Sequence, residues 1–217
     1  MSCPACHLAQ ASAARAVHEG ITARPQFASP SLIGAIAYCG HDPADDSRWA
    51  ESGAPSRAEY GRWCRHWCGM ACLQMILEHR DGTAPSLHSL LTGSLPFGAY
   101  QEQPGGSIQG MYYDPFAQYT AARHRLKAQV HRQLPISGIQ AELAAGCLVI
   151  ASVHKEIRRP SVPPLSKGGH LVLVTGYDGD LLHFRNPSGH THSARNAILS
   201  CATFTDFYAE RAISVRP

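Results

Sequence analysis

The chain has little charge and no long apolar run, and both shortages narrow the kinds of protein it can be. Only 16% of its 217 residues are Asp, Glu, Lys or Arg, and the net charge is +3 with histidine neutral. Binding to nucleic acid or to an anionic membrane surface needs a concentrated basic face, which this composition does not offer. No apolar run reaches the length that spans a bilayer. We therefore expect neither nucleic acid nor a membrane as a partner.

The N-terminus also lacks the basic segment, apolar core and cleavage site of a secretory signal. The chain is therefore expected to be cytoplasmic, with most of its eight cysteines reduced. Cys3 and Cys6 stand in a Cys-Pro-Ala-Cys-His sequence that matches the c-type haem attachment pattern, but no haem-binding domain follows. A reactive tail is the favoured interpretation of this motif, with a shared metal or a redox bond as the alternatives. No cofactor is expected.

Hydrophobic residues make up 44% of the chain, which is enough for one globular domain with a full core. Residues 1–57 are loop-rich, and we expect them to form an N-terminal extension laid against a main domain of residues 58–217. Within the extension, Ala11–His18 is predicted to be a short helix that ends at Gly20. The apolar run Leu32–Tyr38 fits either a strand or a short helix.

Helices are predicted mainly in the first half of the main domain. The segments that fit are Cys68–His79, Pro85–Leu91, Met111–Arg125 and Ile136–Ala145. Between the second and third of them, Gly93–Gly110 is predicted to be a long loop. Long loops beside a rigid site commonly decide specificity, so we expect this loop to contribute to substrate choice.

Strands are predicted mainly in the second half. The segments that fit are Lys127–Leu134, Cys147–His154, His170–Tyr177, Leu181–Arg185 and Arg211–Val215, with a short helix at Thr203–Tyr208. Residues 178–180 form a tight turn that joins the third and fourth of these strands into a hairpin. Helices followed by an antiparallel sheet predict an α+β fold.

Cys68 is the strongest candidate for a reactive group. It stands between Trp67 and Gly69, at the start of the apolar helix predicted from residue 68. The free N–H groups and the dipole at a helix N-terminus favour a thiolate over a thiol. A nucleophilic cysteine also needs a histidine to exchange protons with and a third group to orient that histidine.

The predicted hairpin supplies both partners. His170 opens one strand behind Gly168 and Gly169, and Asn186 ends the paired strand. In a hairpin that turns through residues 178–180, the start of one strand lies beside the end of the other. His170 and Asn186 are therefore predicted to be neighbours, although they are 16 positions apart.

These motifs resemble the papain-like cysteine peptidases of the bacteriocin-processing (double-glycine leader peptidase) type. The similarity lies in Cys68-Gly69-x-Ala71, in Gly169-His170 with the apolar strand after it, and in Asn186-Pro187. It covers about residues 60–217 and implies a papain-like fold, with a helical part carrying the nucleophile packed on a C-terminal antiparallel sheet. It also implies that Cys68 is the nucleophile, His170 the base and acid, and Asn186 the orienting residue of a peptidase or amidohydrolase that forms a thioacyl-enzyme.

One position departs from the family, which usually has Gln six residues before the nucleophile. Arg62 stands there in this chain. The oxyanion is expected to take the Cys68 backbone N–H, and Arg62, His66 and Gln26 are the candidates for the second donor. This departure, with the unmatched extension, supports the alternative of an acyl- or aminoacyl-transferase in peptide or small-molecule biosynthesis.

The remaining assignments concern substrate and metal. The substrate-binding candidates are Trp63, Trp67, Gly69, Gly168 and Gly169. The paired glycines leave room for a substrate backbone. The alternative for both tryptophans is that they pack in the hydrophobic core. The expected partner is a peptide or a small-molecule acyl substrate, and no metal site is expected. A non-enzymatic metal-binding protein that uses the cysteines and histidines is the third hypothesis. The oligomeric state is not indicated.

Overall fold

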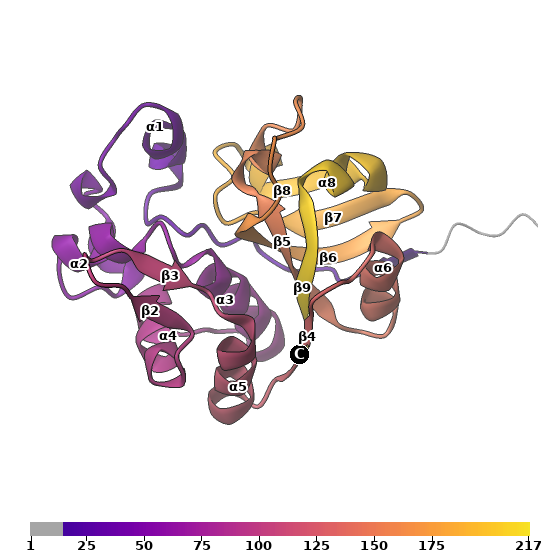
Figure 1. The fold of residues 1–217 in the computed structure, drawn as a ribbon, viewed down its shortest axis with the longest axis horizontal. Helices are drawn as coiled ribbons and strands as arrows, with labels where there is room; N and C mark the ends of the chain where they lie inside the picture. The colour runs from indigo at the N-terminus through magenta and orange to yellow at the C-terminus, as the bar shows by residue number, and fades with distance from the viewer. Residues whose placement is uncertain (1–14) are drawn as a thin grey trace, which may run out of the picture.

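The computed structural model describes residues 15–217, so the motif at Cys3 and Cys6 lies outside the described residues. Figure 1 shows two parts side by side, with helices from the first half of the chain in one and an antiparallel sheet from the second half in the other. The helical part contains α1 (Ile33–Tyr38), α2 (Arg57–Trp63), α3 (Cys68–Asp81), α4 (Leu87–Ser94) and α5 (Tyr113–His124).

Helix α3 is the centre of the helical part. Residues 69–73 and 75–77 are all buried, so the helix has no polar face toward solvent over its first two turns and must be surrounded by other elements. It packs against β6 and β5 of the sheet and against α4. It ends at Gly82, which adopts the left-handed conformation with φ 75° that a helix C-terminus commonly requires.

Serine side chains begin three of the other helices. Ser56, Ser86 and Ser200 accept hydrogen bonds from the backbone N–H three residues later, at 3.1, 3.2 and 3.1 Å. Each bond satisfies one of the N–H groups that a helix start leaves without an acceptor. These caps place the starts of α2, α4 and α8 (Cys201–Phe207).

The sheet has seven strands in the described part of the chain, and all their pairings are antiparallel. Its main path runs β4-β9-β5-β6-β7-β8, with β1 (Arg15–Val17) added to the end of β6. The strands of the path are β4 (Lys127–His131), β5 (Leu148–His154), β6 (Gly169–Asp178), β7 (Leu181–Arg185), β8 (Asn196–Ser200) and β9 (Tyr208–Arg216). The helices α6 (Ile136–Ala144) and α7 (His192–Arg195) complete this part.

Both faces of the sheet are covered. Leu148 and Ile150 of β5 belong to the same hydrophobic cluster as α3, whereas Val149 and Ala151 belong to a second cluster with residues of α6 and α8. Successive side chains of a strand point to opposite faces, so a strand between two cores is apolar at every position. This explains why residues 147–153 show no alternation of polar and apolar residues.

The predicted helix at Ala11–His18 is wrong for its described residues. Residues 15–17 form β1, whose register pairs Arg15 with Asp178 and Val17 with Gly176. A Cβ on Gly176 would come within 2.6 Å of the Val17 Cα, so the glycine lets the two backbones approach. Pairing with β6 overrides the weak helical pattern of this short segment.

The loop predicted at Gly93–Gly110 is also incorrect over its second half, residues 100–110. It contains a two-stranded hairpin of β2 (Tyr100–Glu102) and β3 (Ile108–Gly110). Leu32–Tyr38, left open between strand and helix, is helical in α1. Strand β8 and helix α7 were not predicted, because their short mixed sequences carry no clear periodicity. The division of the chain at residue 57 stays a prediction.

Candidate active site

Cys68 is the first residue of α3 and is half-buried. The Trp67 carbonyl accepts the N–H of Ala71, so the N–H groups of Cys68 and its next two neighbours have no acceptor within the helix. The backbone N–H groups of Leu171, across the interface, of Gly69 and of Cys68 itself lie near enough to the thiol to favour its thiolate form. The thiol therefore lies at the helix start and against the beginning of β6, and Cys68 and His170 line the same cavity.

His170 is held by the segment that follows β7. Its Nε2 lies 2.9 Å from Asn186 Oδ1 and 3.1 Å from Ser188 Oγ. The Ser188 backbone N–H donates to the same Asn186 oxygen at 3.0 Å, which identifies that atom as the acceptor end of the amide. His170 Nε2 must then carry the hydrogen, and Nδ1 of the neutral ring keeps its lone pair. The hairpin prediction that placed His170 beside Asn186 is confirmed.

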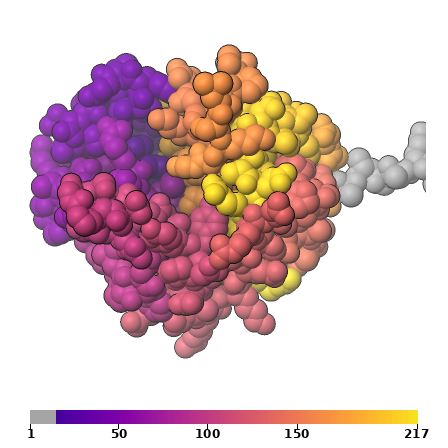
Figure 2. Space-filling model, in the orientation of Figure 1, coloured from indigo at the N-terminus to yellow at the C-terminus, as the bar shows by residue number. Residues whose placement is uncertain are grey.

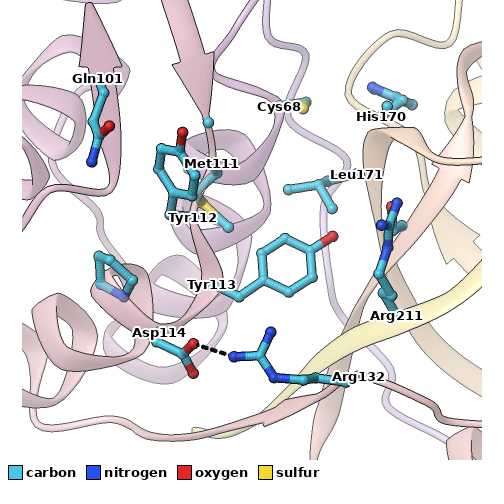
Figure 3. A pocket seen from close by; sticks show the side chains of 14 residues that line it. Cys68, Gln101, Met111, Tyr112, Tyr113, Asp114, Arg132, His170, Leu171 and Arg211 are labelled. Atoms are coloured by element: carbon cyan, nitrogen blue, oxygen red, sulfur yellow. Dashed lines mark hydrogen bonds and ion pairs between the residues drawn. The ribbon is translucent and has the colours of Figure 1, made fainter.

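Cys68 and His170 line one cavity of about 480 Å³ at the junction of the two parts (Figure 3). In Figure 2 the magenta surface around residues 100–115 meets the orange and yellow surface of the sheet along this junction. The rest of the lining comes from the β2–β3 hairpin, the segment that leads into α5 and its first turn, the residue after β4, and strands β5, β6 and β9: Gln101, Gly110, Met111, Tyr112, Tyr113, Asp114, Pro115, Arg132, Ser152, Gly169, Leu171 and Arg211. Two elements thus contribute the proposed chemistry, and several others shape the space beside it.

Burial favours the neutral form of both Cys68 and His170. It raises the pKa of the Cys68 thiol to about 11, although the N–H groups of Leu171, Gly69 and Cys68 act to lower it. It lowers the pKa of His170 to about 4, although the hydrogen bond with Asn186 acts to raise it, while the positive charge of Arg158 lowers it further. The sequence favoured a thiolate from the helix start alone, and desolvation reverses that direction.

The three candidates for the second oxyanion donor occupy different surroundings. Arg62 forms an ion pair with Glu102 of β2 at the protein surface. Gln26 is buried, and its Nε2 donates to the Cys64 carbonyl at 2.8 Å while its Oε1 has no partner among the described residues. The His66 side chain is half-buried, and burial lowers its pKa. Gln26 also receives the Trp67 indole N–H on its backbone carbonyl, which ties it to the start of α3.

The substrate-binding candidates are distributed unevenly. Trp63 and Trp67 are fully buried and contribute no surface to the cavity, with Trp63 packed edge-on against Tyr100. Gly169 lines the cavity, whereas Gly69 and Gly168 are not among its lining residues. A Cβ at Gly69 would come within 2.5 Å of Met111 Sδ, so this glycine allows the strand-to-helix segment to pack closely on α3.

Sequence reasoning missed several residues of the cavity wall. Ser188, which contacts His170, stands two positions after Asn186, and only the folded turn shows that it reaches the imidazole. Tyr113, Ser152 and Arg211 come from α5, β5 and β9 and meet at the cavity only in the tertiary structure. The hairpin residues Gln101 and Gly110 do fall in the segment expected to contribute to substrate choice.

Two further observations concern metal binding and membrane-spanning helices. Among residues 15–217, no cluster of three or more His, Cys, Asp or Glu side chains is arranged to hold a metal ion. Cys64 and Cys72 are buried, and burial raises the pKa of both thiols. In the same part of the chain, no helix combines the length and the apolar character needed to cross a membrane.

A cysteine at the start of a buried helix that lines one cavity with a histidine of an antiparallel sheet is consistent with the papain-like fold. The chain belongs to the Peptidase_C39 like family, whose model matches residues 36–213. The predicted family resemblance and the predicted α+β, papain-like fold are thereby confirmed, and the chain is a member of a family of cysteine peptidases.

Several solved structures are similar to the chain, each at 16% identity. One is a putative C39-like peptidase from Bacillus anthracis, with a TM-score of 0.49 over 70% of this chain and 88% of that one. The peptidase domain of Streptococcus ComA, a bifunctional ABC transporter in a quorum-sensing pathway, has a TM-score of 0.48 over 70% and 91%. A double glycine motif protease from an AMS/PCAT transporter, in complex with the leader peptide, has a TM-score of 0.46 over 69% and 84%. No curated protein matches the chain.

Proposed function

We propose that this protein hydrolyses a peptide bond with Cys68 as the nucleophile, His170 as the proton carrier and Asn186 as the residue that positions His170. The observation that carries the proposal is that Cys68 and His170 line one cavity while His170 Nε2 is bound to Asn186 Oδ1 at 2.9 Å. This hydrogen bond leaves Nδ1 as the only basic atom of the ring. A single base beside a single cysteine is what nucleophilic catalysis requires.

The reaction starts from a neutral thiol and a neutral imidazole. His170 Nδ1 accepts the thiol proton as the sulfur attacks the substrate carbonyl, so no separate thiolate has to be maintained in a buried site. The imidazolium that forms is stabilised by Asn186 Oδ1, which accepts from Nε2. His170 then returns the proton to the leaving amine, and the acyl group stays on Cys68 as a thioester. Water, deprotonated by His170, attacks the thioester and releases the acid.

The developing oxyanion takes the N–H of Cys68, which the helix start leaves without an acceptor. We infer that Gln26 supplies the second donor. Its amide nitrogen carries two hydrogens, and one hydrogen bond to the Cys64 carbonyl leaves the other available. Arg62, by contrast, is engaged with Glu102 at the surface.

The first experiment measures cleavage of a mixture of synthetic peptides by mass spectrometry, with the wild type and Cys68→Ala side by side. We expect cleavage by the wild type and its loss in Cys68→Ala, with unchanged folding by circular dichroism. Equal cleavage by both proteins would exclude Cys68 as the nucleophile. Addition of an amine to the acyl-enzyme tests the alternative of acyl transfer, because a transferase yields an amide where a peptidase yields the free acid.

The same assay identifies the second oxyanion donor. Removing one such donor typically lowers kcat by about 100-fold or more, so Gln26→Ala should lose that much whereas Arg62→Ala and His66→Ala should not. A large loss in either of the latter, with Gln26→Ala close to wild type, would reassign the donor.

A further inference from the structure

The cavity beside Cys68 contains one positive charge that no described residue neutralises. Its charged lining residues, apart from His170, are Asp114, Arg132 and Arg211. Arg132 Nη2 pairs with Asp114 Oδ2 at 2.7 Å. Arg211 has neither an ion pair nor a side-chain hydrogen bond with any residue between 15 and 217, so the wall carries a net charge of +1.

Two hydroxyl groups lie on the same side of the cavity as the Arg211 guanidinium. A Cβ placed on Gly168 would be 2.9 Å from Arg211 Nη2 and 3.2 Å from Ser152 Oγ, so these two atoms converge on one point. Burial raises the pKa of the Tyr113 phenol, and Ser152 and the positive charge of Arg211 act to lower it, so both lie close to this hydroxyl group. Figure 3 shows Tyr113 directed across the cavity toward Arg211, below Cys68 and His170.

A bulge in the sheet turns Arg211 toward this point. In the pairing of β5 with β9, Ala151 faces Ala212 and Val153 faces Tyr208, so three residues of β9 stand opposite Ser152. Glu210, inside the bulge, has a φ of 55°, a conformation that costs energy for a residue with a side chain. Bulges are common beside active sites because they redirect a side chain out of the regular pleat.

From these observations we propose that Arg211, Ser152 and Tyr113 form a subsite for a carboxylate of the substrate. A guanidinium and two hydroxyl groups are the donors that a carboxylate accepts, and a bound carboxylate would neutralise the excess charge of the wall. The inference rests on the proposed function, because it assigns the subsite to a substrate that reacts at Cys68. The carboxylate belongs either to an Asp or Glu side chain beside the cleaved bond or to the C-terminus of a short peptide.

The first test uses two small alkylating agents in place of the unknown substrate. Iodoacetate and iodoacetamide alkylate Cys68 by the same type of substitution: the sulfur forms a bond to carbon, iodide leaves with the electrons of the C–I bond, and the thiol proton passes to solvent through His170. They differ only in carrying a carboxylate or an amide. We expect the ratio of the two rates at Cys68 to favour iodoacetate in the wild type and to fall about fivefold in Arg211→Gln, as for an ion pair of about 1 kcal/mol.

Matched variants separate the subsite from general charge. Arg211→Lys keeps the charge and should recover much of the ratio, and added salt should lower the ratio in the wild type. Arg216→Gln removes a charge from the same strand outside the cavity and should leave the ratio unchanged. An identical ratio in the wild type and Arg211→Gln would overturn the proposal.

The second test uses cleaved peptides in matched pairs. One series exchanges Asp with Asn and Glu with Gln on either side of the cut, and the other exchanges a free C-terminus with its amide. In one of the two series, the acidic peptide should have a kcat/KM about 10-fold or more above that of its neutral match, because a charge-assisted hydrogen bond contributes about that much. Arg211→Gln should remove this difference. The responding series identifies the source of the carboxylate.

The two proposals fail in different ways. If cleavage depends on Cys68 but changes neither with the charge of the peptide nor in Arg211→Gln, the carboxylate subsite is rejected and the peptidase function is supported. An alkylation ratio that depends on Arg211, without cleavage of any peptide, would keep the subsite and reject the peptidase.

Discussion

At Cys68 two opposing influences act on one sulfur atom. Three backbone N–H groups stabilise the thiolate, and desolvation destabilises it more, which leaves the pKa at about 11. His170 is displaced in the complementary direction, to about 4. Both groups are therefore neutral near pH 7 in the folded protein, and in the proposed mechanism the proton moves as the sulfur forms its bond. Asn186 matters in this scheme because it fixes which ring nitrogen carries the hydrogen.

The role of Asn186 can be separated from that of its neighbour Ser188. Asn186→Ala removes the acceptor of His170 Nε2–H and frees the ring to rotate, so kcat should fall by about 100-fold, the loss expected from a misplaced catalytic group. Ser188→Ala leaves that acceptor in place and should cost much less. The measurements are kcat, KM and its pH profile, with melting temperature as the check on folding. Equal losses in both variants would argue against a positioning role for Asn186.

At the scale of elements, one β-bulge and two glycines adapt the regular strands and helices to the segments packed against them. The bulge of β9 redirects Arg211, and Gly69 lets the segment at Met111 approach α3. Gly176 admits β1, because a Cβ there would lie 2.7 Å from the Ala16 carbonyl oxygen and 2.6 Å from the Val17 Cα. The two contacts at Gly176 involve backbone atoms, which cannot move aside as a flexible side chain can.

A methyl group at Gly176 should therefore displace β1. Gly176→Ala is expected to lower the free energy of unfolding by about 1–3 kcal/mol, the usual cost of overpacking, measured by urea denaturation. The control is a chain that starts at residue 18, in which the same substitution has no β1 to displace. If Gly176→Ala costs as much in the shortened chain, the steric conflict lies elsewhere.

At the scale of the whole molecule, the cavity exists because the helical part and the sheet meet along α3 and β6. Cys68 comes from one side of this junction and His170 from the other, and the packing buries His170 while Cys68 is half-buried. The free energy of unfolding therefore depends on the site, because burial lowers the pKa of His170 in the folded state relative to the unfolded chain.

This coupling predicts how the unfolding equilibrium depends on pH. His170 has a pKa of about 4 when folded, against an ordinary value of 6.5. Above 6.5 neither state binds the proton, and as the pH falls from 6.5 to about 4 the unfolded chain binds it first, so stability is lost. The contribution is about 3 kcal/mol by pH 4. Urea denaturation of the wild type and His170→Gln at several pH values measures it as a difference in slope, and parallel curves would contradict it.

Much of the fold follows from local patterns. The apolar run after Cys68 predicts α3, and the runs after Cys147 and His170 predict β5 and β6. Long or continuous apolar segments are typical of buried helices and central strands. The hairpin geometry also places His170 beside Asn186. β1 and the β2–β3 hairpin were missed, since three-residue strands depend on the partner they pair with more than on their own sequence.

The sequence by itself determined the helix that carries Cys68, the hairpin that carries His170 and Asn186, and the family to which they point. These features depend on residues close in the chain, where periodicity and turn chemistry act directly. The tertiary structure decided the charge states of Cys68 and His170, the contact of Ser188 with the imidazole, and the convergence of Tyr113, Ser152 and Arg211 on one wall. Desolvation and long-range convergence arise only when distant segments pack together, so no local pattern encodes them.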